Sequence, residues 1–228
     1  MTRIETVRTI AGLTTTVVGS ARDPMAIVFL HGFSMQASDF APFAHSLGVA
    51  AQFWFPDGLV AGGLGGRAWW DLDLGQRTIA LAHGPRDLYQ EVPDGRAAAR
   101  AALAQFLDEI SIEIGTRPLV IIGFSQGGML AFDHVLHAAQ RPAALVLLSS
   151  SRIAWPQWQP LLGAVQGLPM FVSHGRTDDD LAFSAGEAIR DAAMLGGAKV
   201  TWLPFDGGHG VPMIVWRGLR KFLHGLLA

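Results

Sequence analysis

The sequence predicts an α/β fold in which a mostly parallel central sheet carries helices on both faces. Six short apolar runs have the length and composition of buried strands, and they lie at residues 25–30, 51–55, 118–123, 143–149, 169–173 and 198–203. Helical patterns separate several of these runs. Buried strands that alternate with helices form parallel sheets covered on both faces, and such sheets bind ligands beyond the carboxyl ends of their strands.

The remaining elements follow from local patterns along the chain. Two short edge strands are expected near the N-terminus, because Glu5, Arg8 and the threonines at 14–16 interrupt the apolar segment that a signal peptide needs. The segment 95–110 predicts a helix, since it is rich in alanine and repeats apolar residues at helical spacing. Further helices are predicted over 128–139, 181–195 and 211–227.

Composition limits the classes of partner. With 228 residues, 50% of them hydrophobic, the chain can bury one substantial core, and we expect a single domain over 1–228 without a large separate cap. A net charge of -2 with scattered arginines argues against a nucleic-acid partner. No apolar run reaches the roughly 18 residues of a membrane-spanning helix, so no integral membrane association is expected. The absence of cysteine excludes disulfides and thiolate metal sites, and it fits a cytoplasmic location.

The segment GFSQG at 123–127 predicts a nucleophile elbow, the sharp strand-to-helix turn that exposes a reactive serine. It follows the apolar run 118–122 and opens the expected helix 128–139. Flanking glycines avoid Cβ clashes in such a turn, and the central hydroxyl stands at the helix N-terminus. Ser125 is therefore the candidate nucleophile. The alternative is a glycine-rich turn without function.

A serine nucleophile needs a base within hydrogen-bond reach and an acid that orients the base. Asp178 follows the expected strand 169–173, and His209 follows the expected strand 198–203. The chain order serine, acid, histidine is that of α/β-hydrolases. Asp179 and Asp180 are also candidates for the acid, and the two aspartates that do not serve are expected to form a solvated loop face.

Seven other histidines are weaker candidates for the base. Five have no motif around them or lie on a helix face. His31 and His174 each precede a glycine at a strand end, where a histidine typically braces a turn through hydrogen bonds. His209 lies in a loop with three glycines, which lets an imidazole approach another loop closely.

Acyl transfer also needs N–H groups that hold a developing oxyanion. One candidate is the backbone N–H of Gln126, directly after the nucleophile, and the other is that of Phe33 in the loop after the strand 25–30. Metal and cofactor motifs are missing from the sequence, which has no HExxH, GxGxxG or P-loop, and the run 178–180 lacks the spaced ligands of a calcium loop. We therefore expect neither a metal nor a cofactor.

Together these motifs resemble one family of small α/β-hydrolases, which contains carboxylesterases, lysophospholipases and acyl-protein thioesterases. The resemblance covers most of the chain and rests on LHG at 30–32, FPD at 55–57, RAWWD at 67–71, GFSQGG at 123–128, HGRTD at 174–178 and GH at 208–209. It implies a serine hydrolase with Ser125 as nucleophile, His209 as base and Asp178 as its orienting acid. The oxyanion donors that it implies are the amides of Phe33 and Gln126. In this family the acid stands four residues after the histidine of the His-Gly pair, which favours Asp178 over its neighbours.

The chain departs from the family pattern at three positions. The family usually has leucine in place of Phe33, proline in place of Asp179 and glutamate in place of Gly210. Phe33 could narrow the acyl pocket, so a preference for long chains does not transfer.

The sequence thus predicts a carboxylesterase that cleaves esters of short to medium acyl chains through an acyl-enzyme intermediate. Phe33, Trp69, Trp70 and Met129 could line the acyl groove, although aromatic residues fill cores at least as often as pockets. A lysophospholipase or thioesterase would use the same triad, and a silent binding protein of the same fold is a more remote alternative. The expected partner is a small-molecule ester, and a homodimer would be unsurprising. The loop 155–160 is either a pocket flap or a subunit contact.

Overall fold

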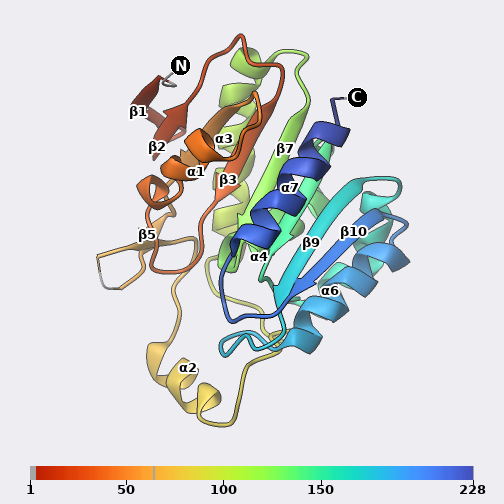
Figure 1. The fold of residues 1–228 in the computed structure, drawn as a ribbon. Coiled ribbons are helices and arrows are strands. Elements are labelled where there is room, and N and C mark those ends of the chain that lie inside the picture. The colour runs from red at the N-terminus through yellow and green to blue at the C-terminus, as the bar shows by residue number, and fades with distance from the viewer. Residues whose placement is uncertain (1–3, 64, 228) are drawn as a thin grey trace.

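Eight strands form the central sheet of the protein (Figure 1). The computed structural model describes residues 4–63 and 65–227. Across the sheet the strands lie in the order β1-β2-β4-β3-β7-β8-β9-β10, and all neighbours from β4 to β10 are parallel. Their bounds are β1 (Glu5–Ile10), β2 (Leu13–Val18), β3 (Ala26–Leu30), β4 (Gln52–Pro56), β7 (Leu119–Phe124), β8 (Ala144–Leu148), β9 (Pro169–Gly175) and β10 (Lys199–Phe205). The predicted mostly parallel sheet is confirmed.

The six predicted core strands all exist, with ends within two residues of the expected ones. Strands β3, β4, β7 and β8 are buried almost throughout, as expected of strands whose two faces are both covered. The prediction of two N-terminal edge strands is wrong for β2, which pairs with β1 on one side and β4 on the other. At the opposite edge, β10 is only partly buried.

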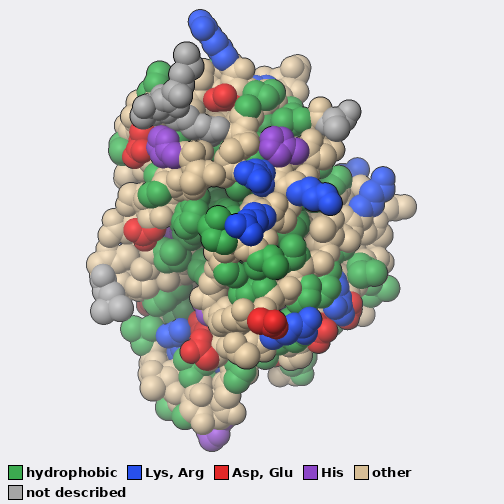
Figure 2. Space-filling view, viewed as in Figure 1, with side chains coloured by type: hydrophobic (Ala, Val, Ile, Leu, Met, Phe, Trp, Pro, Cys, Tyr) green, Lys and Arg blue, Asp and Glu red, His purple; other side chains and the backbone are tan. Residues whose placement is uncertain are grey.

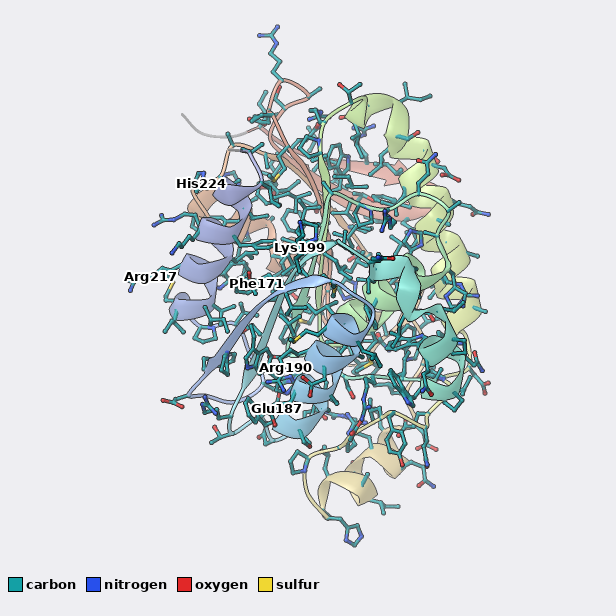
Figure 3. All side chains as sticks on the ribbon, turned by 90° about the vertical axis from the view of Figure 1, so that its right-hand side faces the viewer. Phe171, Glu187, Arg190, Lys199, Arg217 and His224 are labelled. Atoms are coloured by element: carbon teal, nitrogen blue, oxygen red, sulfur yellow. The ribbon has the colours of Figure 1, made fainter. Side chains whose placement is uncertain are left out.

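Helices cover both faces of the sheet, as predicted. On one face lie α1 (Ala41–Ser46) and α7 (Met213–Gly225), whose apolar side chains share a core with β3, β4 and β7. The other face carries α3 (Arg96–Ile114), α4 (Gln126–His137) and α6 (Phe183–Leu195). Figure 3 shows Arg217 and His224 pointing away from the sheet on the outer side of α7, and Glu187 and Arg190 on the surface of α6. Helices α6 and α7 are therefore amphipathic, with one buried and one exposed face, whereas α4 is buried on nearly all sides.

Several short elements lie outside the predicted set. They are η1 (Ala37–Asp39), the β5 (Val60–Ala61) and β6 (Arg67–Ala68) pair, α2 (Leu74–Leu81), α5 (Trp155–Trp158) and η2 (Gln159–Val165). Helix α2 is only eight residues long and buries none of them, so it adds no buried face to the core. Its start is fixed instead by Asp73, whose carboxylate accepts a hydrogen bond from the Gln76 N–H at 2.9 Å. Helix α4 begins at Gln126, two residues earlier than predicted.

The segment 155–160 is tied to the core by Trp158. This side chain is fully buried, and its indole N–H donates to the Asp133 carboxylate of α4 at 2.7 Å. The same buried carboxylate pairs with Arg96 at 3.2 Å and with Arg100 at 2.9 Å, both from α3. Asp133 therefore joins three helices through charge-assisted hydrogen bonds.

Substitution of Asp133 by alanine is expected to lower the free energy of unfolding by about 3 to 5 kcal/mol, because it leaves the buried Arg96 without its charged partner. Chemical denaturation would measure the change. The matched control is Asp191→Ala, which removes an exposed partner of Arg190 and should cost less than about 1 kcal/mol. Equal costs for the two variants would contradict this account of Asp133.

Candidate active site

Ser125 occupies a strained turn between β7 and α4. Its φ of 52° and ψ of -117° lie outside the regions that most residues adopt, as expected of a nucleophile elbow. The Ser125 N–H donates to Leu148 O at 2.9 Å, and its carbonyl accepts hydrogen bonds from the amides of Gly128 and Met129. The neighbouring strand β8 and the first turn of α4 thus hold the strained residue in place.

The two glycines that flank Ser125 are required by close backbone contacts. A Cβ on Gly123 would lie 2.3 Å from Gly127 O, and a Cβ on Gly127 would lie 2.2 Å from Leu30 O. Both distances are far below van der Waals contact, so any other residue would push α4 away from β3 and β7. The glycine spacing predicted from the sequence therefore has a steric origin.

Ser125, His209 and Asp178 form one continuous chain of hydrogen bonds. Each residue follows the carboxyl end of a parallel strand, β7, β10 and β9 respectively, so the three loops meet at one edge of the sheet. His209 Nε2 lies 3.0 Å from Ser125 Oγ, and His209 Nδ1 lies 2.7 Å from Asp178 Oδ2. A neutral imidazole whose Nδ1–H donates to a carboxylate presents an unprotonated Nε2 to the hydroxyl, which is the arrangement of a general base.

Asp178 is a buried carboxylate surrounded by donors. Oδ1 accepts hydrogen bonds from the amides of Asp180 and Leu181, both at 2.9 Å. Oδ2 lies 3.2 Å from His174 Nε2, besides its bond to His209. Burial by itself raises the pKa of Asp178, but the hydrogen bonds from His174 and His209 outweigh it and hold the pKa well below the usual value.

The lowered pKa of Asp178 predicts acid sensitivity. In the unfolded chain an aspartate titrates near pH ~3.9, so the carboxylate stabilises the fold fully above about pH 5, and this contribution declines as the pH falls toward the lowered value. Urea titrations at several pH values should therefore show a steeper loss of stability below pH ~4 for the wild type than for Asp178→Asn. Parallel curves for the two proteins would contradict the predicted linkage.

The expectation that the other two aspartates form a solvated face is wrong for Asp180. Its side chain is only 17% exposed and pairs with Arg77 at 2.9 Å and with Arg86 at 2.5 Å. Burial by itself raises the pKa of Asp180, but the two guanidinium groups have the larger effect and hold the pKa below its usual value. Asp179 is exposed, as expected. Arg77 comes from α2, an element that the sequence pattern did not reveal, so the pairing could not be anticipated.

Sequence reasoning also missed the positioning role of His174. It was expected to brace a turn, and its Nε2 does lie 2.9 Å from Leu181 O. Because Nε2 faces both this carbonyl and the Asp178 carboxylate, it must carry a hydrogen. His31 fits the expectation more simply, since its Nε2 accepts from the Gly58 N–H at 2.8 Å and its Nδ1 lies 2.7 Å from Gly32 O.

The amides of Phe33 and Gln126 have no hydrogen-bond acceptor among the described residues. The Gln126 N–H lies at the first position of α4, where no intrahelical partner exists. The Gln126 side chain fixes the backbone of the neighbouring segment, because it accepts a hydrogen bond from the Trp69 N–H and donates one to Trp70 O, both at 2.9 Å. Trp69 is buried, and its indole N–H donates to His31 O at 3.0 Å, so it packs as a core residue that supports the loop 31–33.

Two cavities border Ser125. The larger, of about 450 Å³, also contacts Phe33, Phe43, Trp216 and His209. The smaller, of about 30 Å³, contacts Trp70 and Met129. Of the predicted substrate-binding residues, Phe33, Trp70 and Met129 thus line a cavity at the serine, whereas Trp69 lines neither.

Within residues 4–63 and 65–227, no cluster of His, Asp or Glu side chains has the arrangement of a metal site, and no helix is both long and apolar enough to span a bilayer.

A parallel sheet with an elbow serine after one strand, and an acid and a histidine after two later strands, defines an α/β-hydrolase. The chain belongs to the phospholipase/carboxylesterase family, whose model matches residues 13–224. This result confirms the family resemblance seen in the sequence, and it makes the protein a member of a hydrolase family.

Solved structures with the same fold include carboxylesterases and a thioesterase. The carboxylesterase of Mesorhizobium loti is 17% identical, with 97% of this chain and 99% of that chain aligned at a TM-score of 0.76. Acyl-protein thioesterase 2 of Zea mays is 20% identical over 94% of this chain and 99% of that chain, also at a TM-score of 0.76. The Bacillus cereus carboxylesterase is 18% identical over 94% of each chain, at a TM-score of 0.73. At these identities the likeness is one of fold. No curated protein matches the sequence significantly.

Proposed function

We propose that the protein is a serine carboxylesterase that hydrolyses carboxylic esters through an acyl-enzyme intermediate. The observation that carries this proposal is the unbroken chain from the buried Asp178 carboxylate through His209 to the Ser125 hydroxyl, with links of 2.7 and 3.0 Å. These lengths lie within the range at which a base takes a proton from a nucleophile.

In the first half of the reaction, Ser125 Oγ forms a bond to the ester carbonyl carbon while its proton moves to His209 Nε2. The carbonyl π electrons move to the oxygen, which becomes an oxyanion. Collapse of this intermediate breaks the bond to the alcohol, and the proton on Nε2 goes to the leaving oxygen. The products of this half are a free alcohol and an acyl group on Ser125.

In the second half, a water molecule gives a proton to His209 Nε2 and adds to the acyl carbon. Collapse then releases the carboxylic acid, and the proton returns to Ser125 Oγ. Asp178 keeps its charge throughout and stabilises the imidazolium that forms in each half, a role that suits a carboxylate with a lowered pKa. The free amides of Phe33 and Gln126 supply the oxyanion donors, each worth several kcal/mol of barrier.

Labelling with a fluorophosphonate tests whether the serine is activated. We expect the probe to modify Ser125 alone, as located by peptide mass spectrometry, and an excess of p-nitrophenyl acetate to slow the labelling. A protein with the fold but without the activity would bind ligands in its cavity and leave Ser125 unmodified, which would overturn the proposal. Hydrolysis of p-nitrophenyl acetate, butyrate, octanoate and palmitate would then rank the acyl chains that are accepted.

A further inference from the structure

The two cavities at Ser125 differ greatly in size, at about 450 and 30 Å³. We propose that the larger cavity holds the leaving alcohol and the smaller one the acyl group, so that the preferred substrate is an ester of a small acid with a bulky aromatic alcohol. This inference rests on the proposed esterase function and adds a substrate class to it.

The position of His209 shows which of the two cavities holds the leaving alcohol. Its Nε2 must deliver a proton to the leaving oxygen, so the alcohol has to lie beside the imidazole. His209 lines the larger cavity together with Gly210 and Val211 from the same loop, and it does not line the smaller one. The larger cavity is therefore on the leaving-group side.

The position of the acyl group follows by elimination from the other substituents of the reacting carbon. Once bonded to Ser125 Oγ, this carbon carries an oxyanion, the leaving oxygen and the acyl group. The oxyanion faces the amides of Phe33 and Gln126, and the leaving oxygen faces His209. The acyl group is left with the space between Gln126 and Met129, which is where the smaller cavity lies.

The acyl cavity is both small and firmly walled. A single water needs about 10 to 15 Å³ of the same kind of volume, so about 30 Å³ accepts an acetyl or propionyl group but no longer chain. Its apolar walls include Trp70, Leu88, Met129, Ile153 and Leu181, which are all buried. The Trp70 backbone is additionally held by the Gln126 side chain. A longer acyl chain would have to displace packed core side chains, which is costly.

The leaving-group cavity is large and aromatic. Phe40 lies within 5.7 Å of Phe43 and 6.2 Å of Phe124, measured between ring centroids, and Phe43 stacks on Trp216 at 4.3 Å. Such a set of rings binds another aromatic ring through offset and edge contacts. Of the charged groups among the described residues that line it, Arg77 is paired with Asp180, and Asp39 accepts a hydrogen bond from the Gln36 N–H, so the cavity offers no unpaired cation to an anionic group. Figure 2 shows hydrophobic side chains gathered between α1 and the basic residues of α7, where a separate groove of about 110 Å³ shares Phe43 and Trp216 with this cavity.

A pair of constitutional isomers tests the assignment. Phenethyl acetate places its ring on the alcohol, whereas methyl hydrocinnamate places the same ring on the acid, and both release simple primary alcohols. We expect kcat/KM to be at least about tenfold higher for phenethyl acetate. An equal or reversed preference would overturn the inference.

Two variants address the cavities separately. Phe43→Ala should lower kcat/KM several-fold more for phenethyl acetate than for methyl acetate, because only the first substrate reaches the ring. Met129→Ala should raise kcat/KM for methyl hydrocinnamate by enlarging the acyl side. Phe222→Ala, which truncates a partly buried phenylalanine of α7 outside both cavities, is the matched control and should keep the wild-type ratio.

Fluorophosphonate labelling separates failure of the inference from failure of the function. If Ser125 is labelled and phenethyl acetate is not preferred, the substrate assignment is wrong and the esterase proposal stands. If Ser125 is not labelled and no ester is hydrolysed, both fail.

Discussion

Replacement of Ser125 by alanine is expected to lower kcat for p-nitrophenyl acetate by about 10⁴-fold or more, because no other group can form the acyl-enzyme. The fold should survive, since the hydroxyl is hydrogen-bonded only to His209 among the described side chains and the backbone contacts of the elbow are unchanged. Steady-state kinetics and thermal unfolding of the same preparation would measure both effects.

Ser173→Ala is the matched control for this experiment. Ser173 is another buried serine, in β9, and its hydroxyl has no hydrogen-bond partner among the described residues. Its removal should leave kcat within about twofold of the wild type and cost little stability. If Ser125→Ala kept more than about one hundredth of the activity, Ser125 would not be the nucleophile.

Asp178→Asn is expected to lower kcat by about 10⁴-fold with little change in KM. The carboxylate accepts the Nδ1 hydrogen of His209. An amide N–H₂ at that place would donate to Nδ1 instead, so that Nε2 would carry the hydrogen and could not take a proton from Ser125. The amides of Asp180 and Leu181 would still find an acceptor in the asparagine oxygen.

The neighbouring residue Asp179 provides the control for the acid. It is exposed, so Asp179→Asn should leave kcat within about twofold of the wild type. A similar loss in both variants, or a loss below about 100-fold in Asp178→Asn, would contradict the assignment of Asp178 as the orienting acid. The two variants together distinguish Asp178 from Asp179, two of the three consecutive aspartates among which the residue pattern, without the family resemblance, left the acid open.

The sheet and the hydrogen-bonded chain of the site could be predicted because local sequence encodes them. Buried parallel strands need short, continuous apolar runs, and the elbow needs glycines at 123 and 127 because backbone atoms lie where a Cβ would stand. Strand ends of a parallel sheet meet at one edge, so the chain order of Ser125, Asp178 and His209 already implied their approach.

The remaining features depend on tertiary contacts that have no local signal. Asp180 is largely shielded from solvent because α2 brings Arg77 over it, and α2 is a helix without a buried face. The aromatic cavity joins Phe43 of α1 to Trp216 of α7, which lie far apart in the sequence. Trp69 and Trp70 are adjacent, yet one supports the loop 31–33 and the other lines the small cavity, a difference of side-chain direction alone.

Trapping of the acyl-enzyme tests most directly the central claim that Ser125 is the nucleophile of an esterase. The protein would be mixed with p-nitrophenyl acetate, quenched with acid during turnover and digested, and the peptide that contains Ser125 would be examined by mass spectrometry. The account predicts an acetyl group on Ser125 that forms with a burst of p-nitrophenol and disappears as the substrate is consumed. Turnover without any acyl group on that peptide would contradict it.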